Sequence, residues 1–113
     1  MRDISIRLST AFQRDFKRLA KRHRSLGYDL KNLIASLKDN PLQGADLGWG
    51  CRKVRMAITS KDKGKSGGAR VITLTIRLES DGVLTLLTIY DKSERGSIDK
   101  KTLLRLLKEV ERE

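Results

Sequence analysis

The sequence predicts an α+β domain with elements in the order β-α-α-β-β-β-α: a small, mostly antiparallel sheet, a helical hairpin and a C-terminal helix. Two observations predict this class. Some segments alternate apolar and polar residues, as half-buried strands do, and others repeat apolar residues every three or four positions, as amphipathic helices do. The length of 113 residues suits one compact domain, residues 1–113, with its helices on one face of the sheet.

One strand and two helices are predicted at the N-terminal end. Residues 4–9 alternate apolar and polar side chains, which indicates a strand. Thr10 and Gln13 have the spacing of a capping box, so a helix begins there and ends near Gly27. Its apolar face consists of Phe12, Phe16, Leu19, Ala20 and His23. A second amphipathic helix runs from about residue 29 to residue 38, and the short joint predicts an antiparallel hairpin.

The middle of the chain contains a loop, a strand and a turn. Residues 40–51, NPLQGADLGWGC, show no period and are predicted to be a glycine-rich connection. Residues 52–60 alternate, which predicts a strand. Residues 61–68, KDKGKSGG, are basic and rich in glycine and are predicted to form a turn.

Two more strands and a helix complete the expected fold. Residues 70–78 and 83–91 are joined through Asp81-Gly82, a dipeptide typical of hairpin turns. The second of these strands is apolar almost throughout, as is typical of a strand covered on both faces. Ser97 is expected to cap a last helix, residues 98–111.

The chain is strongly basic. Its 25 lysines and arginines against 14 acidic residues give a net charge of +11, which points to an anionic partner. Residues 1–26 carry eight basic and two acidic groups, and residues 52–70 carry seven and one, so each block has a net charge of +6. This partner could be a nucleic acid, an acidic protein or an anionic membrane surface. The basic residues of the first helix and of the turn are candidate contacts for such a partner: Arg14, Lys17, Arg18, Lys21, Arg22, Lys61, Lys63 and Lys65.

Several classes of site are not expected. A single cysteine, Cys51, cannot form an intrachain disulfide framework, and with a single histidine, His23, no cofactor or metal site is expected. Cys51 is interpreted as a buried small apolar residue, and His23 as a core or boundary residue. Trp49 stacks on a base or packs over the sheet edge. The N-terminus lacks a signal region and no apolar run spans a bilayer, so we expect a cytoplasmic protein without membrane contact.

The strand alternation predicts a candidate catalytic surface. Five side chains can converge on a face that the helices leave open: Lys53, Arg55, Arg70, Tyr90 and Lys92. Such a set can hold a phosphate and offer proton donors of different strength, although a merely solvated basic face fits the pattern equally well. Arg70 has the parity of Ile72 and Leu74, so it points towards the core unless a bulge at the preceding glycines turns it.

The glycine-rich turn is not a P-loop, because Thr59 stands where the first glycine is required and no helix follows. Four segments instead resemble the RelE/HigB toxins of bacterial toxin–antitoxin modules. These are ADLG at 45–48, RKVRMAI at 52–58, GKSGGARVI at 64–72 and IYDKSER at 89–95, and the likeness runs from about residue 12 to residue 110.

The resemblance implies an endoribonuclease that cuts messenger RNA, usually in the ribosomal A site, and that an acidic antitoxin holds inactive. It also implies that the basic residues of the first helix and the turn bind the backbone of ribosomal RNA, and that DNA is contacted only through the antitoxin. Lys53 and Arg55 match the two basic positions of the family's second strand, Arg70 the arginine that opens the third, and Lys92 the basic position after the fourth. The aromatic acid or base of the RelE pattern falls near Asp99, so it is absent here.

The implied reaction is attack of the RNA 2′-hydroxyl on its own phosphate. Lys53 with Arg55 is then the general base and positioning pair, Arg70 stabilises the developing charge, and Lys92 or Tyr90 is the acid. Two other functions remain open at this point. One is a ParE-like DNA gyrase inhibitor of the same fold, which does not need this cationic set, and the other is a non-catalytic RNA- or ribosome-binding module.

Overall fold

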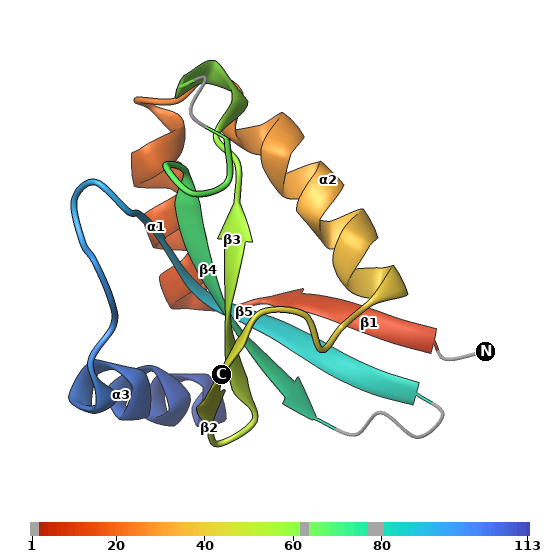
Figure 1. Ribbon diagram of the computed structural model, residues 1–113. Helices are drawn as coiled ribbons and strands as arrows, with labels where there is room; N and C mark the ends of the chain where they lie inside the picture. The colour runs from red at the N-terminus through yellow and green to blue at the C-terminus, as the bar shows by residue number, and fades with distance from the viewer. Residues whose placement is uncertain (1–2, 62–63, 77–80) are drawn as a thin grey trace.

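The computed structural model describes residues 3–61, 64–76 and 81–113, and it has the expected α+β architecture. Five strands form one mixed sheet in the spatial order β1-β5-β4-β3-β2 (Figure 1). The elements are β1 (Asp3–Leu8), α1 (Thr10–Ala20), α2 (Leu26–Asp39), β2 (Ala45–Gly48), β3 (Cys51–Met56), the 3₁₀ turn η1 (Thr59–Lys61), β4 (Ala69–Ile76), β5 (Asp81–Asp91) and α3 (Lys100–Glu111). No helix in these ranges is long and apolar enough to cross a membrane.

The sheet is mostly antiparallel, as predicted. β1 pairs in parallel with β5, and every other neighbouring pair is antiparallel. The prediction that residues 40–51 form only a connection is wrong, because β2 pairs with β3 in a short hairpin. A strand of four residues is too short to display a period, and three successive positive φ angles, at Gly48, Trp49 and Gly50, make the turn.

The helix boundaries differ from the predicted ones in three places. The N-cap of α1 is Ser9, whose hydroxyl accepts a hydrogen bond from the Phe12 N–H at 3.0 Å and also donates to the Leu87 carbonyl in β5. Gly27 lies inside α2 rather than ending α1. Asp99, not Ser97, caps α3, since its carboxylate accepts from the Thr102 N–H at 2.7 Å.

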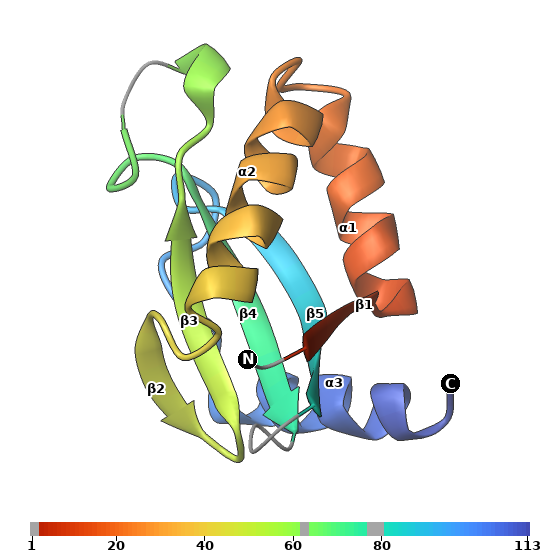
Figure 2. The ribbon, with the colours of Figure 1, turned by 90° about the vertical axis from the view of Figure 1, so that its right-hand side faces the viewer.

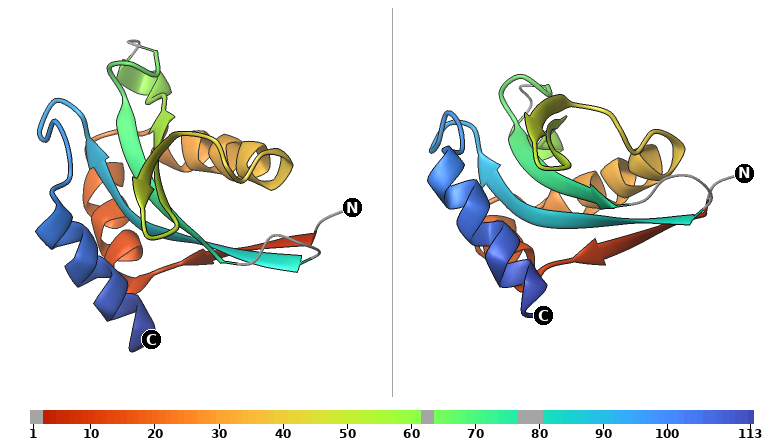
Figure 3. Two further views of the ribbon diagram at one scale, coloured as in Figure 1. Left: turned by 60° about the horizontal axis from the view of Figure 1, so that its bottom comes forward. Right: turned by 90° about the horizontal axis from the view of Figure 1, so that it is seen from below.

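The two faces of the sheet are covered by different helices, so the expectation that all helices pack on one face is wrong. α1 and α2 cover the first face with a large core, in which Phe12 and Leu33 contact strand residues such as Val54 and Val71. α3 runs crosswise to β3 and β4 at the bottom of Figure 2. It packs on the second face in a core that includes Ile72. α1 and α3 lie towards one end of the sheet and α2 towards the other (Figure 3).

A bulge in β5 changes which side chains face each core. The pairing of β4 with β5 shifts between Ile72, which lies opposite Thr88, and Thr73, which lies opposite Leu86, so one extra residue, Leu87, is inserted in β5. Leu86 and Ile89 therefore belong to the first core, whereas Leu87 and Tyr90 belong to the second. The predicted strand covered on both faces is confirmed, and the bulge sets the face on which its C-terminal residues lie.

We expect Gly68→Ala to destabilise the fold. A Cβ at Gly68 would lie 2.2 Å from the Met56 carbonyl oxygen and 3.0 Å from the Ala57 Cα, both of which are backbone atoms. Overpacking of this kind costs about 1–3 kcal/mol, to be measured by urea unfolding. Gly27→Ala is the matched control, since nothing lies within 4 Å of the added Cβ in α2 and stability should rise by up to about 1 kcal/mol. Equal stabilities of the two variants would contradict the packing at Gly68.

Candidate active site

Three candidate residues lie in register across the three central strands. Arg55 of β3 lies opposite Arg70 of β4, and Arg70 lies opposite Tyr90 of β5. Directly paired residues share a face of the sheet, so these three side chains form one row, here called the Arg55–Tyr90 row. Lys53 extends it on the same face, opposite Ile72. The structure therefore brings together four of the five predicted catalytic residues, on the face that also carries α3.

Arg70 lies at the centre of this row and is almost completely buried. Arg70 lies on the same face of β4 as Ile72, as expected. No bulge at Gly67 and Gly68 is needed to bring it to the site, because this face is also the face of Lys53. Its guanidinium donates hydrogen bonds to the carbonyl oxygens of Lys65 at 3.0 Å, Ser66 at 3.1 Å and Ala69 at 3.1 Å. Arg70 therefore holds the glycine-rich turn that carries Lys65 against the sheet.

Tyr90 supplies a phenol at the other end of the row. The ring packs in the second core, and the Arg95 guanidinium lies over it at 5.7 Å from its centroid. Its hydroxyl is buried and has no hydrogen-bond partner among the described residues. Burial raises the pKa of Tyr90 above its usual value, although the nearby charges of Arg70 and Arg95 act in the opposite direction. The phenol is protonated at neutral pH and is thus a potential proton donor.

Two adjoining cavities open at the edge of β3. β2 begins at Ala45, opposite Lys53, so β3 has no strand neighbour on that side beyond this residue. The first cavity, here called the basic cavity, has a volume of about 490 Å³ and is lined by Lys53, Arg55 and Lys65. The second, here called the α2 cavity, has a volume of about 210 Å³ and lies between α2 and β3. Arg55 and Lys65 line both, so cations from β3 and from the turn converge at their junction.

Asp91, which follows Tyr90 and precedes Lys92 in the sequence, has a buried carboxylate that was not predicted as part of the site. Asp91 accepts hydrogen bonds from the Lys61 ammonium at 2.9 Å and from the backbone N–H of Ser93 at 2.9 Å, and the His23 Nε2 lies 3.1 Å away. Burial alone would raise the pKa of Asp91, but the hydrogen bonds from Lys61 and Ser93 outweigh it and lower the pKa to about 2. These partners are distant in sequence, so no local pattern could reveal them.

The segment after β5 is anchored by two acidic residues. Asp91 binds Lys61 and His23, and Glu94 pairs with Arg18 at 3.7 Å and with Arg22 at the end of α1. Lys92 stands between these two anchors with its side chain exposed, and its backbone N–H donates to the Gly68 carbonyl at 3.1 Å. The anchors thus hold the exposed Lys92 beside the turn that carries Lys65.

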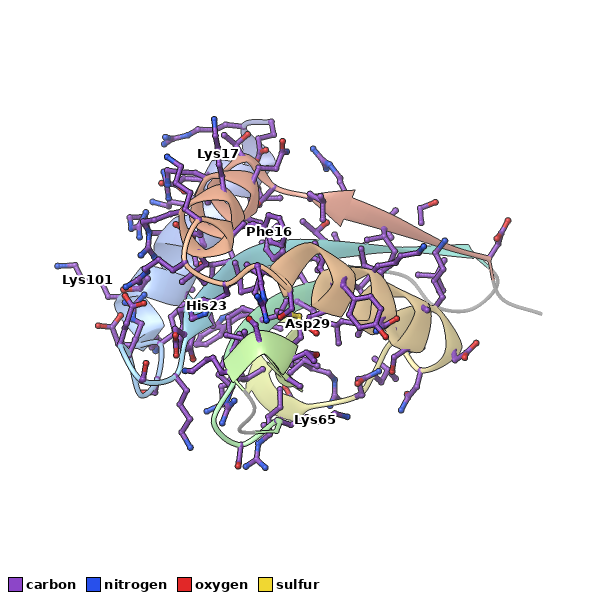
Figure 4. The ribbon with its side chains drawn as sticks, turned by 90° about the horizontal axis from the view of Figure 1, so that it is seen from above. Phe16, Lys17, His23, Asp29, Lys65 and Lys101 are labelled. Atoms are coloured by element: carbon purple, nitrogen blue, oxygen red, sulfur yellow. The ribbon has the colours of Figure 1, made fainter. Side chains whose placement is uncertain are left out.

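The predicted RNA-binding residues separate into two surfaces. Lys17 and Lys21 are exposed on α1, and Arg14 pairs with its neighbour Asp15 at 3.6 Å. Figure 4 places Lys17 and Lys65 on opposite sides of the molecule, with His23 and Asp29 between them. Lys61 does not extend from the turn, because its ammonium is paired with Asp91, and Lys63 lies outside the described residues.

Three further residues that the sequence analysis singled out differ in how far they are buried: Trp49, Cys51 and His23. Trp49 is half-exposed at the β2–β3 turn, where the Lys100 ammonium of α3 lies 5.3 Å from its ring centroid. Cys51 is fully buried, as predicted. This burial, together with a smaller effect of the negative charge of Asp46, raises the pKa of the Cys51 thiol to about 11. His23 is a boundary histidine, as predicted, with 15% of its side chain exposed. Within residues 3–61, 64–76 and 81–113, no group of three His, Cys, Asp or Glu side chains could hold a metal ion.

Fold and site together define a small basic α+β protein whose cation-lined surface suits an anionic ligand. The family model described as the RelE toxin of the RelE/RelB toxin–antitoxin system matches residues 10–111. The chain therefore belongs to the RelE toxin family and is the toxin of a toxin–antitoxin system, with an antitoxin protein as its partner. The resemblance inferred from the four sequence segments is confirmed. A comparison with curated proteins gives no match.

We expect Asp91→Asn to lower stability in a pH-dependent way. The folded-state pKa of about 2 lies below the usual value for an aspartate, so ionised Asp91 stabilises the fold above about pH 4. This contribution is lost as the pH falls from about 4 to about 2. Urea unfolding should therefore show a large difference between variant and wild type at pH 7 that shrinks below pH 4. Asp39→Asn, at an exposed position, is the control, and an Asp91→Asn variant as stable as wild type at pH 7 would disprove the anchoring role.

Proposed function

We propose that this toxin is a ribosome-dependent mRNA interferase, an endoribonuclease that inhibits translation by cleaving messenger RNA. The observation that carries the proposal is the register of Arg55, Arg70 and Tyr90 across three strands, with Lys53 beside them on the same face. Membership of the RelE family, whose toxins are generally endoribonucleases, supports it. The ribosome, as the site of action, implies a cytoplasmic protein.

The cleavage reaction needs little more than cations, a base and an acid. The 2′-hydroxyl of the RNA is the nucleophile, so the protein orients it, removes its proton, stabilises the negative charge on the phosphorane and protonates the leaving 5′-oxygen. Arg55 and Lys65 line the basic cavity together with Lys53, and two cations beside an amine suit a phosphate group. Lys53 is the candidate base because it is the amine that β3 presents to this cavity, and in its neutral form it accepts the proton of the 2′-hydroxyl.

Two residues remain candidates for the general acid. Tyr90 is protonated at neutral pH and has a hydroxyl without a partner in the described residues, but the ring is buried in the second core, so the residues that cover it must move before RNA can reach it. Lys92 is exposed and requires no such movement. Arg70 contributes positive charge at the centre of the row and also positions Lys65 through its hydrogen bonds to the turn. It is therefore a candidate both for charge stabilisation and for positioning.

The proposed partners follow from the same charges. A net charge of +11 attracts the ribosomal RNA backbone, and the exposed lysines of α1 lie on a surface separate from the basic cavity. Backbone contacts through α1 would orient the toxin without reading sequence. An acidic antitoxin segment that neutralises the basic cavity would block the same groups that bind the messenger.

Arg55→Ala should abolish most of the cleavage without unfolding the protein. Loss of one preorganised group that stabilises the transition-state charge lowers the rate by about 10² or more. The side chain of Arg55 is exposed, so its removal leaves both cores intact. The measurement is induced expression in bacteria with mapping of cleaved transcripts. Arg112→Ala, at an exposed position at the end of α3, is the matched control and should cleave as wild type does. Full cleavage by the Arg55→Ala variant would remove this residue from the mechanism.

The proposed attack by the 2′-hydroxyl determines the ends of the products. The upstream fragment should end in a 2′,3′-cyclic phosphate, and the downstream fragment should begin with a 5′-hydroxyl, because the 2′-oxygen displaces the 5′-oxygen. A ribosome-bound messenger with a 2′-deoxynucleotide at the cut site should bind and remain whole. Cleavage of this analogue, or a downstream 5′-phosphate, would refute the mechanism. A growth defect without any cleaved transcript would instead favour a gyrase inhibitor or a binding module.

A further inference from the structure

The α2 cavity differs in chemistry from the basic cavity that it adjoins. Its floor is apolar, with the buried side chains of Leu33 and Met56. Its rim carries the amides and hydroxyl of Asn32, Ser36 and Gln43. The Asn32 amide offers both a hydrogen-bond donor and an acceptor, whereas Gln43 offers its Oε1 as an acceptor, because its Nε2 donates to Ser36 and Asn40. Such groups match the edges of nucleobases, and an apolar floor suits the face of a base. The α2 cavity thus has the lining of a site for a flat polar ring rather than for a phosphate.

The charges at the two ends of the cavity impose a direction on a bound nucleotide. Arg55 and Lys65 stand at the end shared with the basic cavity, whereas Asp29 lines the α2 cavity. Asp29 is buried and accepts hydrogen bonds from the Thr59 N–H at 2.9 Å, from the Thr59 hydroxyl and from the Ser25 hydroxyl at 2.8 Å. Its negative charge disfavours a phosphate beside it, so the phosphate is expected at the cationic end and the base in the α2 cavity.

The rim of the cavity is partly preorganised. The Gln43 Nε2 donates to the Ser36 hydroxyl at 3.0 Å and to the Asn40 carbonyl at 3.0 Å, so this side chain is held across the end of α2. Gln43 also lines both cavities, at the point where a base and its phosphate would join. Asn32, one helical turn before Ser36, is the other amide within reach of a base.

We propose that the α2 cavity binds the base of a nucleotide flanking the scissile phosphate, and that Asn32 and Gln43 determine which base is preferred there. This inference rests on the proposed function, since it assigns the substrate contacts of the same site. The phosphate lies in the basic cavity on Arg55 and Lys65, and the sugar passes Gln43 at the junction. Base preference at one position beside the cut then comes from the toxin itself and not only from the codon presented by the ribosome.

Binding of small probes tests the proposal without any cleavage. The full-length protein is titrated with the 3′,5′-bisphosphates of adenosine, guanosine, cytidine and uridine, and in parallel with inorganic phosphate, while NMR follows the side-chain amides of Asn32 and Gln43. The bisphosphates should shift both amides to an extent that differs between bases. Inorganic phosphate should affect the surroundings of Arg55 and Lys65 and leave Asn32 unchanged. An Asn32 signal that no bisphosphate moves at saturation, or that phosphate moves equally, would overturn the proposal.

Cut-site mapping with Asn32→Ala gives the second test. The ratio of bases at one position next to the cut should change by roughly fivefold, the factor expected when one hydrogen bond is lost. Asn40→Ala is the matched control: its side chain lines neither cavity, and the backbone carbonyl that Gln43 contacts is retained. An unchanged distribution of cut sites would overturn the role of Asn32. Absence of cleavage by the wild type would instead refute the proposed function, and the titration would still decide whether the cavity binds a base.

Discussion

The bulge at Leu87 in β5 is the constraint on which the candidate active site depends. Without the extra residue, Tyr90 would keep the parity of Leu84 and Leu86 and lie beneath α1 and α2. With it, Tyr90 turns to the other face, opposite Arg70 and in line with Arg55. A bulge interrupts the hydrogen-bond ladder, and it persists here because Leu87 itself is completely buried in the second core. The packing of α3 and the assembly of the row are thus parts of one arrangement.

The structure also has to hold several positive charges close together around the candidate site. Carbonyl oxygens of the turn accept hydrogen bonds from Arg70, and Asp91 balances Lys61. These partners do not bind Lys53 or Arg55. Arg70 and Lys61 therefore stabilise the turn and η1, whereas Lys53 and Arg55 remain available in the basic cavity. Burying a cation without such partners would be costly. This division explains how a chain with a net charge of +11 keeps a cationic site and a stable fold together.

Sequence patterns predicted correctly on which face of the sheet the candidate residues of β3 lie, because strand alternation decides it. The apolar side chains of Val54 and Met56 face the first core, so Lys53 and Arg55 had to lie on the opposite face. The prediction for Arg70 was incomplete for a related reason. It does share a face with Ile72, but only the structure reveals that this face has an apolar core of its own and also carries the cations. The prediction assumed that only one face of the sheet is covered by helices, and this assumption was wrong.

The sequence by itself determined the α+β class, the amphipathic helices, four of the five strands and the anionic character of its partners. These follow from periodicity and charge, which are local properties of the chain. Only the tertiary structure decided which face α3 covers, where β5 bulges, and that Asp91 joins His23 to Lys61. It also decided that Asn32 lies beside Arg55 around one cavity. Each of these depends on contacts between segments far apart in the chain, and such contacts produce no periodic pattern in the local sequence.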